Sequence, residues 1–254
     1  METPLISLVM ITKDCEDTLD LSLKSAKDIT QEIIIVDSYS KDRTIEIAKK
    51  YNANIYFHEY LSEGKQRKIA LNKARGKWVL VLDSDEVVSQ ELKREIKERL
   101  SIEKDCEGFF IHIQSHYMGK RIKYGGESYE KLCLFRRNSK NIFLKDALVH
   151  ADMINKKAKV LHLKNKIDHY SYRNFLQMYK KFTDYALREA RQKRARGEKT
   201  SLRKIILYPL HMFWARFVKD KGHMDGFFRI PLDAGFAYME FLTYFSMLFI
   251  KNKK

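Results

Sequence analysis

Short apolar runs alternate with helical patterns over the first hundred residues. The runs at 5–11, 32–37 and 78–82 are rich in aliphatic residues, which is typical of strands buried on both faces of a sheet. The stretches between them place apolar residues three and four apart, which predicts helices at about 16–28, 42–51, 62–75 and 89–100, with a short strand at 53–57. Strands that alternate with helices predict an α/β fold with a parallel or mostly parallel sheet.

The pattern changes after residue 101. We expect strands at 107–117, 131–136 and 159–164. Three helical stretches follow, from Tyr172 to about Arg196, over Leu202–Val218 with a bend at Pro209, and over Leu232–Ile250. The second part of the chain is therefore predicted to be increasingly helical.

Acidic and hydroxyl residues follow three of the predicted strands. The first strand ends at Thr12, the second at Asp37, and a later one at Asp83-Ser84-Asp85. Ligands bind at the carboxyl ends of the strands in sheets of this class. This coincidence predicts one ligand site that draws on all three strand ends.

Asp83 and Asp85 lie two residues apart, so their carboxylates would face the same way if the strand geometry continued through them. Two carboxylates could then hold Mg²⁺ or Mn²⁺ against the phosphates of a ligand. A solvated acidic turn after the strand is the alternative. Asp37 likewise suits either a nucleoside contact or the cap of the next helix, and Lys65, Arg67 and Lys68 suit either a diphosphate contact or a solvated helix face.

Several motifs resemble those of the family 2 glycosyltransferases. The second strand continues as Asp37-Ser38-Tyr39-Ser40-Lys41-Asp42-Arg43-Thr44, and Gln66-Arg67-Lys68 and Ala74-Arg75-Gly76-Lys77-Trp78 precede Asp83-Ser84-Asp85-Glu86. Within the family, the chain is most similar to the lipopolysaccharide core β-1,4-glucosyltransferase branch. That similarity rests on Leu132-Cys133-Leu134-Phe135-Arg136-Arg137, Val149-His150, His169-Tyr170-Ser171 and a G-x-x-D-G element at Gly222–Gly226.

The resemblance implies a GT-A type, Rossmann-like mixed sheet with a helical C-terminal extension. It also implies inverting transfer of a hexose, glucose in that branch, from a UDP-linked donor to a lipopolysaccharide core or another lipid-linked glycan. By the same analogy Thr12 and Asp37 hold the nucleoside, and Lys68 lies near the base or diphosphate. Asp83 lies near the ribose or the metal, and Asp85 binds the metal.

Inverting transfer also needs a carboxylate that removes the proton from the acceptor hydroxyl. Glu127 and Glu130 lie in a predicted loop between two strands, and we slightly prefer Glu127. An exposed loop acid remains the alternative for either one. His150 suits a metal or phosphate contact, with a partly buried structural histidine as the alternative.

The charge of the chain is unevenly distributed. Residues 1–100 carry 17 Lys and Arg against 18 Asp and Glu, whereas residues 101–254 carry 32 against 15. Such an excess suggests an anionic partner, which includes a phosphorylated substrate, an acidic membrane surface or nucleic acid. The sparse cysteines Cys15, Cys106 and Cys133 fit a reducing compartment.

The helical stretch Leu232–Ile250 is close to the length that spans a bilayer, but Asp233 and Glu240 interrupt it. We expect it to lie on the inner face of the cytoplasmic membrane or to pack against the catalytic domain. The predicted domains are a catalytic domain at 1–170, with a nucleotide-binding half at 1–100 and an acceptor half at 101–170, and a basic, aromatic-rich region at 171–254 associated with membrane or acceptor.

Two other functions fit parts of the sequence. A nucleic-acid-binding protein would explain the basic half, but it leaves the three acidic strand ends without a role. A nucleotidyltransferase on a similar scaffold would be expected to carry a glycine-rich loop after the first strand, and Thr12-Lys13-Asp14-Cys15-Glu16 contains no glycine. The sequence therefore favours a peripheral, metal-dependent glycosyltransferase.

Overall fold

The computed structural model describes residues 5–126, 128–144, 153–155 and 157–250. The chain divides into two compact units. The first contains residues up to Ile113 together with Tyr129–His169, and the second contains Gln114–Ser128 and the residues from Tyr170 onward. The segment 114–128, which includes the end of one strand and a short strand after it, thus belongs with the C-terminal helices and not with the sheet residues that flank it in sequence.

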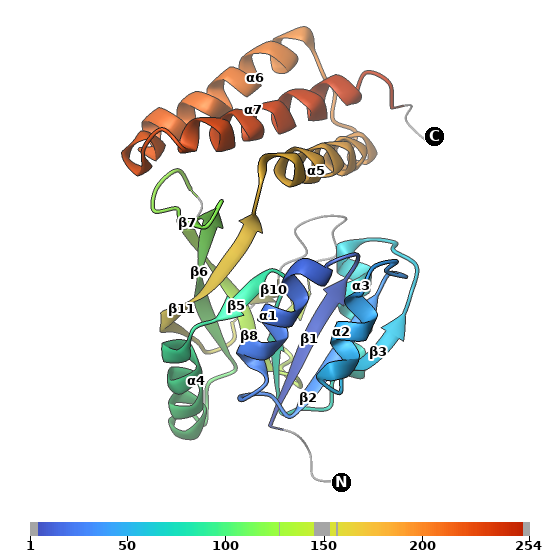
Figure 1. Cartoon of the computed structure of the whole chain (residues 1–254), viewed down its shortest axis with the longest axis vertical. Coiled ribbons are helices and arrows are strands. Elements are labelled where there is room, and N and C mark those ends of the chain that lie inside the picture. Colours follow the sequence, from blue (N-terminus) through green and yellow to red (C-terminus); the bar gives the residue numbers. More distant parts are fainter. Residues whose placement is uncertain (1–4, 127, 145–152, 156, 251–254) are drawn as a thin grey trace. The chain divides into compact units, whose positions relative to one another are not determined.

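The first unit is built on four parallel strands and the helices that connect them (Figure 1). In chain order these elements are β1 (Ile6–Thr12), α1 (Glu16–Ala26), β2 (Glu32–Asp37), α2 (Thr44–Lys50), β3 (Asn54–Phe57), α3 (Glu63–Lys73) and β4 (Trp78–Val81). The parallel pairs are β1 with β2, β2 with β3, and β1 with β4. The predicted α/β fold with a parallel N-terminal half is confirmed.

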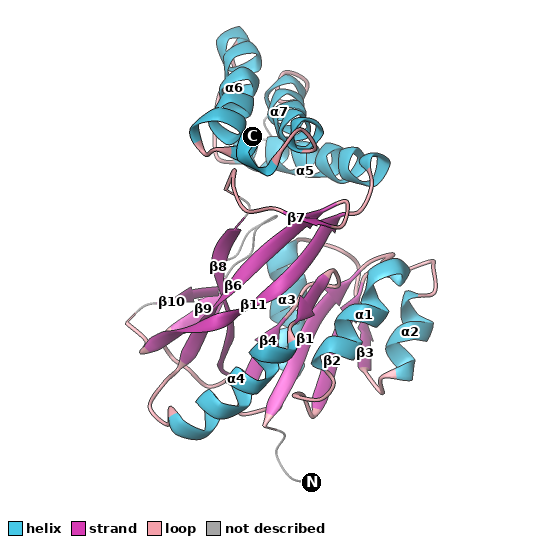
Figure 2. Ribbon diagram, turned by 60° about the vertical axis from the view of Figure 1, so that its left-hand side comes forward, coloured by secondary structure: helices cyan, strands magenta, loops and turns pink. Residues whose placement is uncertain are grey.

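The strand order is β3-β2-β1-β4-β8-β6-β11-β5. The chain places β2 and then β3 on one side of β1, and after β3 it crosses back to place β4 on the other side of β1. Because parallel crossovers are right-handed, this reversal places α3 on the opposite face from α1 and α2. Figure 2 shows α1 and α2 in front of the strands and α3 behind them. The strands between these layers are almost entirely buried: β2 has no exposed residue, and neither has β4.

The remaining strands add antiparallel pairs to this core and make the sheet mixed. They are β5 (Glu86–Val88), β6 (Gly108–Tyr117), β7 (Lys120–Arg121), β8 (Ser128–Arg136) and β11 (Val160–Tyr172), and a separate hairpin contains β9 (Ile142–Leu144) and β10 (Met153–Asn155). β8 pairs with β4, β11 pairs with β5, and α4 (Gln90–Ile102) follows β5. The patterns at 131–136 and 159–164 predicted β8 and β11 too short, and β5, β7, β9 and β10 were not predicted.

The helices of the second unit are α5 (Phe175–Ala195), α6 (Leu202–Trp214) and α7 (Arg229–Ser246). Asn174 and Ser201 cap α5 and α6 by accepting the backbone N–H groups of Gln177 and Lys204. α6 continues into a π-helical turn, Ala215–Lys219, and a short 3₁₀ turn, Gly222–Asp225, leads to α7. The expected helices are confirmed, but β11 occupies 165–172, so the first of them begins at Phe175, and the third begins at Arg229 instead of Leu232.

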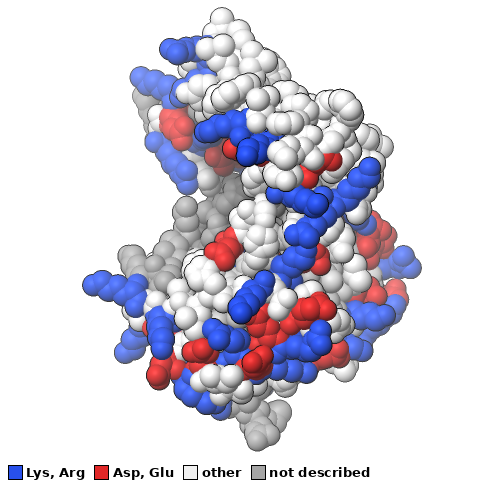
Figure 3. All heavy atoms as spheres, turned by 90° about the vertical axis from the view of Figure 1, so that its left-hand side faces the viewer, with Lys and Arg blue, Asp and Glu red and all other residues white. Residues whose placement is uncertain are grey.

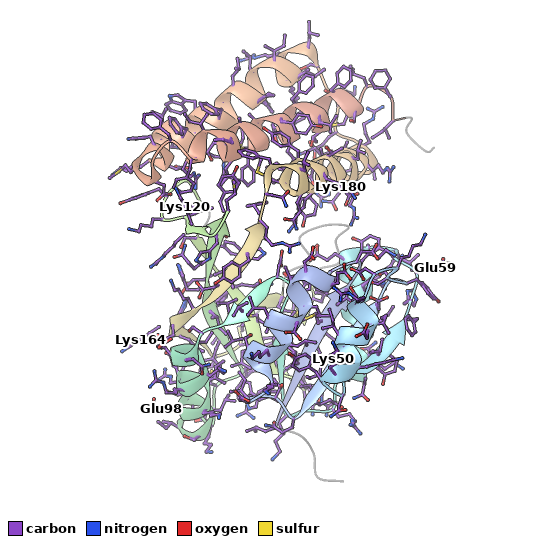
Figure 4. All side chains as sticks on the ribbon, in the orientation of Figure 1. Lys50, Glu59, Glu98, Lys120, Lys164 and Lys180 are labelled. Atoms are coloured by element: carbon purple, nitrogen blue, oxygen red, sulfur yellow. The ribbon has the colours of Figure 1, made fainter. Side chains whose placement is uncertain are left out.

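Buried charges hold the start of α7 against the loop 122–126 within this unit. Arg229 and Asp233 are fully buried, and Arg229 donates to the Asp233 carboxylate and to the carbonyl oxygen of Tyr124. The Asp225 carboxylate accepts the backbone N–H groups of Lys123 and Tyr124. Lys120, labelled in Figure 4, stacks its ammonium over the ring of Phe228, 5.0 Å from its centre.

Candidate active site

The strand order makes the carboxyl ends of β1 and β4 the switch point of the sheet. β1 leads to β2 on one side, whereas β4 lies on its other side, so the strand order reverses at this point. Such a switch point is where open α/β sheets bind their ligands. Thr12 ends β1, Asp37 ends β2, and Asp83 follows β4 closely, so the structure brings all three predicted strand ends to this edge.

A network of hydrogen bonds joins the first two strand ends. The Thr12 hydroxyl donates to Asp37 Oδ2 at 2.7 Å, and Thr12 pairs with Asp37 in the register of β1 and β2. Asp37 is fully buried, and its carboxylate also accepts the backbone N–H and the hydroxyl of Ser40. Asp37 therefore shapes the turn that follows β2, but it does not cap α2, which begins at Thr44.

Aromatic side chains at this edge were not predicted from the sequence. Tyr39 and Phe57 stack with ring centres 5.7 Å apart, and each exposes about half of its surface (53% and 52%). Tyr39 and Asp14, in the loops after β2 and β1, both have positive φ angles, 60° and 45°. Non-glycine residues rarely adopt this conformation, and it is concentrated at ligand sites. An exposed aromatic pair held by strained loops is suited to stacking on a planar ligand.

Asp83 lies in a cluster of opposite charges. It accepts from Arg67 on α3 at 2.7 Å and from Lys131 on β8 at 3.0 Å. Lys131 also contacts Glu86, 2.9 Å away, and the other oxygen of Glu86 accepts the backbone N–H of Asp83. Glu86 is fully buried and the Lys131 side chain is 10% exposed. Arg67 and Lys131 thus set the position of Asp83, and neither role was predicted from the sequence.

The strand geometry does not continue through the acidic triplet, so that expectation is wrong. β4 ends at Val81, and Asp83-Ser84-Asp85 forms a turn closed by a hydrogen bond from the Glu86 N–H to the Asp83 carbonyl oxygen. The carboxylates of Asp83 and Asp85 consequently have different partners. Asp83 binds the two cations, whereas Asp85 Oδ1 lies 3.2 Å from Nε2 of His169 on β11.

Asp85 and His169 together fit a divalent metal ion better than the two aspartates do. Carboxylate and imidazole groups are both metal ligands, and Mg²⁺ commonly takes one or two protein ligands together with substrate phosphates and water. Among the described residues there is no group of three or more His, Cys, Asp and Glu that could hold a metal by itself. A metal here would therefore complete its coordination with the ligand.

The charges around Asp83 give a first prediction. Burial by itself would raise the pKa of Asp83, but the charges of Arg67 and Lys131 outweigh burial and hold the pKa well below its usual range. A carboxyl with a lowered pKa stabilises the fold above its unfolded pKa of about 4, and this contribution is lost as pH falls below that value. Lys131→Met leaves Asp83 and Glu86 without this cation. We expect it to lower the free energy of unfolding by about 3 kcal/mol at pH 7, and by less below about pH 4.

Urea unfolding of both proteins across this pH range measures the effect. Lys77→Met, which removes an exposed lysine of the same unit, is the matched control and should change stability by less than about 0.5 kcal/mol. A Lys131→Met penalty that is the same at pH 7 and pH 3 would contradict the assigned charge network.

The other predicted site residues lie in different surroundings. Lys68 is exposed on α3 and lines a hollow with Lys65 and Arg137. Glu130 Oε1 is 2.9 Å from Nδ1 of His162 on β11, whereas the next residue, Lys131, reaches Asp83, so the structure does not bring Glu130 to the acidic triplet. Glu127 and His150 lie outside the described residues.

The sequence profile of "Glycosyl transferase family 2" matches residues 7–158. That range contains all the strand ends just described and more than half of the chain. The chain belongs to glycosyl transferase family 2: it is a glycosyltransferase with the α/β fold of nucleotide-sugar transferases. This membership favours the glycosyltransferase interpretation over nucleic-acid binding and nucleotidyl transfer.

Relatives of similar length are found in Rickettsia. A protein of Rickettsia typhi described as an uncharacterized glycosyltransferase is 28% identical over 93% of this chain and 84% of its own length. Another, from Rickettsia prowazekii, is 27% identical with the same coverage. Among solved structures, Staphylococcus aureus TarS 1–349 has a TM-score of 0.49 at 17% identity, over 95% of this chain and 91% of TarS 1–349.

Proposed function

We propose that this enzyme transfers a hexose, glucose, from a UDP-linked donor to a lipopolysaccharide core or another lipid-linked glycan, with inversion at the anomeric carbon. The observation that carries the proposal is the convergence of Thr12, Asp37 and the Asp83–Asp85 turn at the switch point of the sheet. Glucose and the lipopolysaccharide acceptor rest on the resemblance of the 132–137, 169–171 and 222–226 motifs to the core glucosyltransferases.

The donor would lie across the ends of β1, β2 and β4. Thr12 and Asp37 are proposed to contact the nucleoside, and the exposed ring of Tyr39 offers a stacking surface for its base. Asp83 would lie near the ribose. Lys68, which is exposed on α3, would lie near the base or the diphosphate.

We propose that Asp85, together with His169, holds Mg²⁺ or Mn²⁺ in this enzyme. Bound there, the ion would offset the negative charge that develops on the nucleoside diphosphate leaving group. The 3.2 Å separation of the two side chains supports this pair, and the cations already bound to Asp83 make that residue the weaker metal ligand. We still propose that Asp83 lies near the ribose of the donor, because it follows β4 at the carboxyl end of the strand.

The proposed base is a carboxylate of the loop before β8. Glu127 remains our first candidate, and Glu130 is the second. The chosen carboxylate would take the proton of the acceptor hydroxyl as its oxygen attacks the anomeric carbon and the bond to the diphosphate breaks. Because Glu130 pairs with His162, it would have to change partner to act in this step.

A donor screen by thermal unfolding tests the proposal directly. We expect UDP-glucose with Mn²⁺ or Mg²⁺ to raise the melting temperature by about 5 °C at about 100-fold its Kd, because ligands that bind only the folded state stabilise it. GDP- and dTDP-sugars should give smaller shifts, and chelation of the metal should remove most of the UDP-glucose shift. If none of the sugar nucleotides stabilises the protein, the proposed donor site is wrong.

A further inference from the structure

The outer face of α6 exposes an apolar stripe. Leu202, Ile206, Leu210, Trp214 and Val218 follow one another at intervals of four residues, and each exposes between 47% and 73% of its surface. The opposite side of α6, with Ile205, packs within the helical unit, where α6 and α7 form an extensive contact. The stripe is therefore a second apolar face in addition to the one that packs α6.

The stripe continues onto α7. An apolar groove of about 360 Å³ lies between the two helices, with Ile206 and Leu210 on one side and Phe241 on the other. Phe241 stacks on Phe245 with ring centres 5.4 Å apart, and Phe249 meets Phe245 edge to face at 5.3 Å. The three rings expose 38%, 40% and 71% of their surface. Together, α6, its π-helical turn and the end of α7 present one continuous apolar surface, called the α6–α7 face below.

The charged side chains at the α6–α7 face are predominantly positive. The segment from Leu202 to Lys219 contains no Asp or Glu, while Arg203 and Lys219 are exposed along it and Lys221 follows. Residues 241–250 carry no charged side chain. Asp233 is buried with Arg216 and Arg229, and Asp220 is the exposed acid next to the turn. Figure 3 shows a broad uncharged area on the helical unit, with Lys and Arg side chains and some Asp and Glu side chains beside it.

An apolar helix face with aromatic side chains and a basic margin is suited to the boundary between lipid headgroups and acyl chains. None of the described helices is both long and apolar enough to cross a bilayer. Pro209 lines the groove, and it lacks the N–H that would otherwise bond back to the carbonyl oxygen of Ile205.

We propose that the α6–α7 face docks this enzyme onto an anionic lipid bilayer, with the stripe and the phenylalanine ladder inserted among the acyl chains. Arg203, Lys219 and Lys221 contact the headgroups of anionic lipids. This inference rests on the proposed function only where it connects docking with a lipid-linked acceptor. The surface itself would bind membranes whichever sugar the enzyme transfers.

Flotation of the full chain with lipid vesicles tests the proposal. We expect strong binding to vesicles that contain phosphatidylglycerol, weaker binding to phosphatidylcholine alone, and a decrease as salt is raised. Ile206→Glu with Leu210→Glu should reduce the bound fraction at least about tenfold, since it places carboxylates where apolar side chains would insert. Arg203→Gln with Lys219→Gln should reduce binding about tenfold on anionic vesicles and much less on neutral ones.

The matched control is Leu21→Glu with Ile102→Glu on α1 and α4 of the first unit. Leu21 exposes 53% and Ile102 61% of its surface, close to the 53% of Ile206 and 64% of Leu210. These changes should leave vesicle binding intact. Equal losses in the control and test variants would overturn the assignment of this face, and so would a wild-type chain that does not float with anionic vesicles.

Light scattering distinguishes membrane docking from self-association, in which a second copy of the chain would cover the α6–α7 face. A wild-type dimer that Ile206→Glu with Leu210→Glu converts to monomer, without vesicle binding by either protein, would assign the face to self-association and overturn the proposal. Donor binding by the same variants, measured by calorimetry with UDP-glucose and Mn²⁺, should equal that of the wild type. Failure of membrane docking is thereby separated from failure of the proposed transferase site.

Discussion

Asp85→Ala is expected to reduce transfer of glucose from UDP-glucose by about a thousandfold in kcat. The acidic turn places Asp85 next to His169, and this pair is the proposed contact with the metal that balances charge on the departing diphosphate. Alanine removes the carboxylate ligand and leaves the imidazole of His169. The loss should appear mainly in kcat, because charge on the leaving group is largest in the transition state. Release of UDP measured with and without added Mn²⁺ provides the readout.

Two comparisons separate a loss of metal binding from a loss of folding. Asp105→Ala removes an exposed acid in the same unit and should keep wild-type activity and metal dependence. Calorimetric binding of Mn²⁺ in the presence of UDP should be about tenfold or more weaker in Asp85→Ala, while its unfolding in urea changes little. Full activity of Asp85→Ala with Mn²⁺ present would rule out the metal assignment.

Local patterns were sufficient to select the strand ends that form the candidate site. Apolar runs predicted β1, β2 and β4, and the rule that ligands bind at strand ends selected Thr12, Asp37 and the acidic triplet. The structure joins Thr12 to Asp37 and brings all three strand ends to one edge of the sheet. To predict that these strand ends lie together, it is enough to know which segments are strands and that neighbouring strands are parallel. The periodicity of apolar residues indicates both.

Antiparallel strand pairs between distant parts of the chain bring Lys131 and His169 to the candidate site, and the sequence did not predict these contacts. Lys131 reaches Asp83 because β8 pairs with β4, and His169 reaches Asp85 because β11 pairs with β5 in the register His169 with Glu86. Lys131 precedes a motif that was noted, and His169 lies in another, but neither has a local signal for its partner. Register between distant strands depends on the packing of both faces, which a single sequence does not specify.

Asp233 shows how a correct observation led to an incomplete interpretation. In the sequence, its charge interrupts an apolar helix and argues against a membrane span. In the structure its carboxylate accepts from Arg229 at 2.8 Å, one turn earlier on α7, and from Arg216 at 3.1 Å. The spacing of four between Arg229 and Asp233 was visible in the sequence and is typical of a helical ion pair. The sequence did not show that both members of this pair are fully buried.

Removal of Asp233 is expected to give the largest loss of stability of the substitutions considered. Asp233→Ala removes the carboxylate that accepts hydrogen bonds from the fully buried Arg229 and leaves it with the Asp225 carboxylate 3.7 Å away. It also removes an ion-pair partner of Arg216. Removing one partner of a buried ion pair costs about 3–5 kcal/mol because the other charge stays desolvated. Arg229 also donates to the Tyr124 carbonyl oxygen, so the loop 122–126 should lose protection together with α7. Urea unfolding gives the total, and amide hydrogen exchange locates it.

Asp220→Ala is the matched control, because Asp220 is an exposed acid at the end of the π-helical turn in the same unit. Its effect should stay within about 0.5 kcal/mol. Hydrogen exchange in Asp233→Ala should rise at the backbone N–H groups of Lys123 and Tyr124, which donate to Asp225 beside Arg229, and remain unchanged in β1 and β2. A change below about 1 kcal/mol, or exchange that rises equally in both units, would show that the Arg229–Asp233 pair does not organise the helical unit.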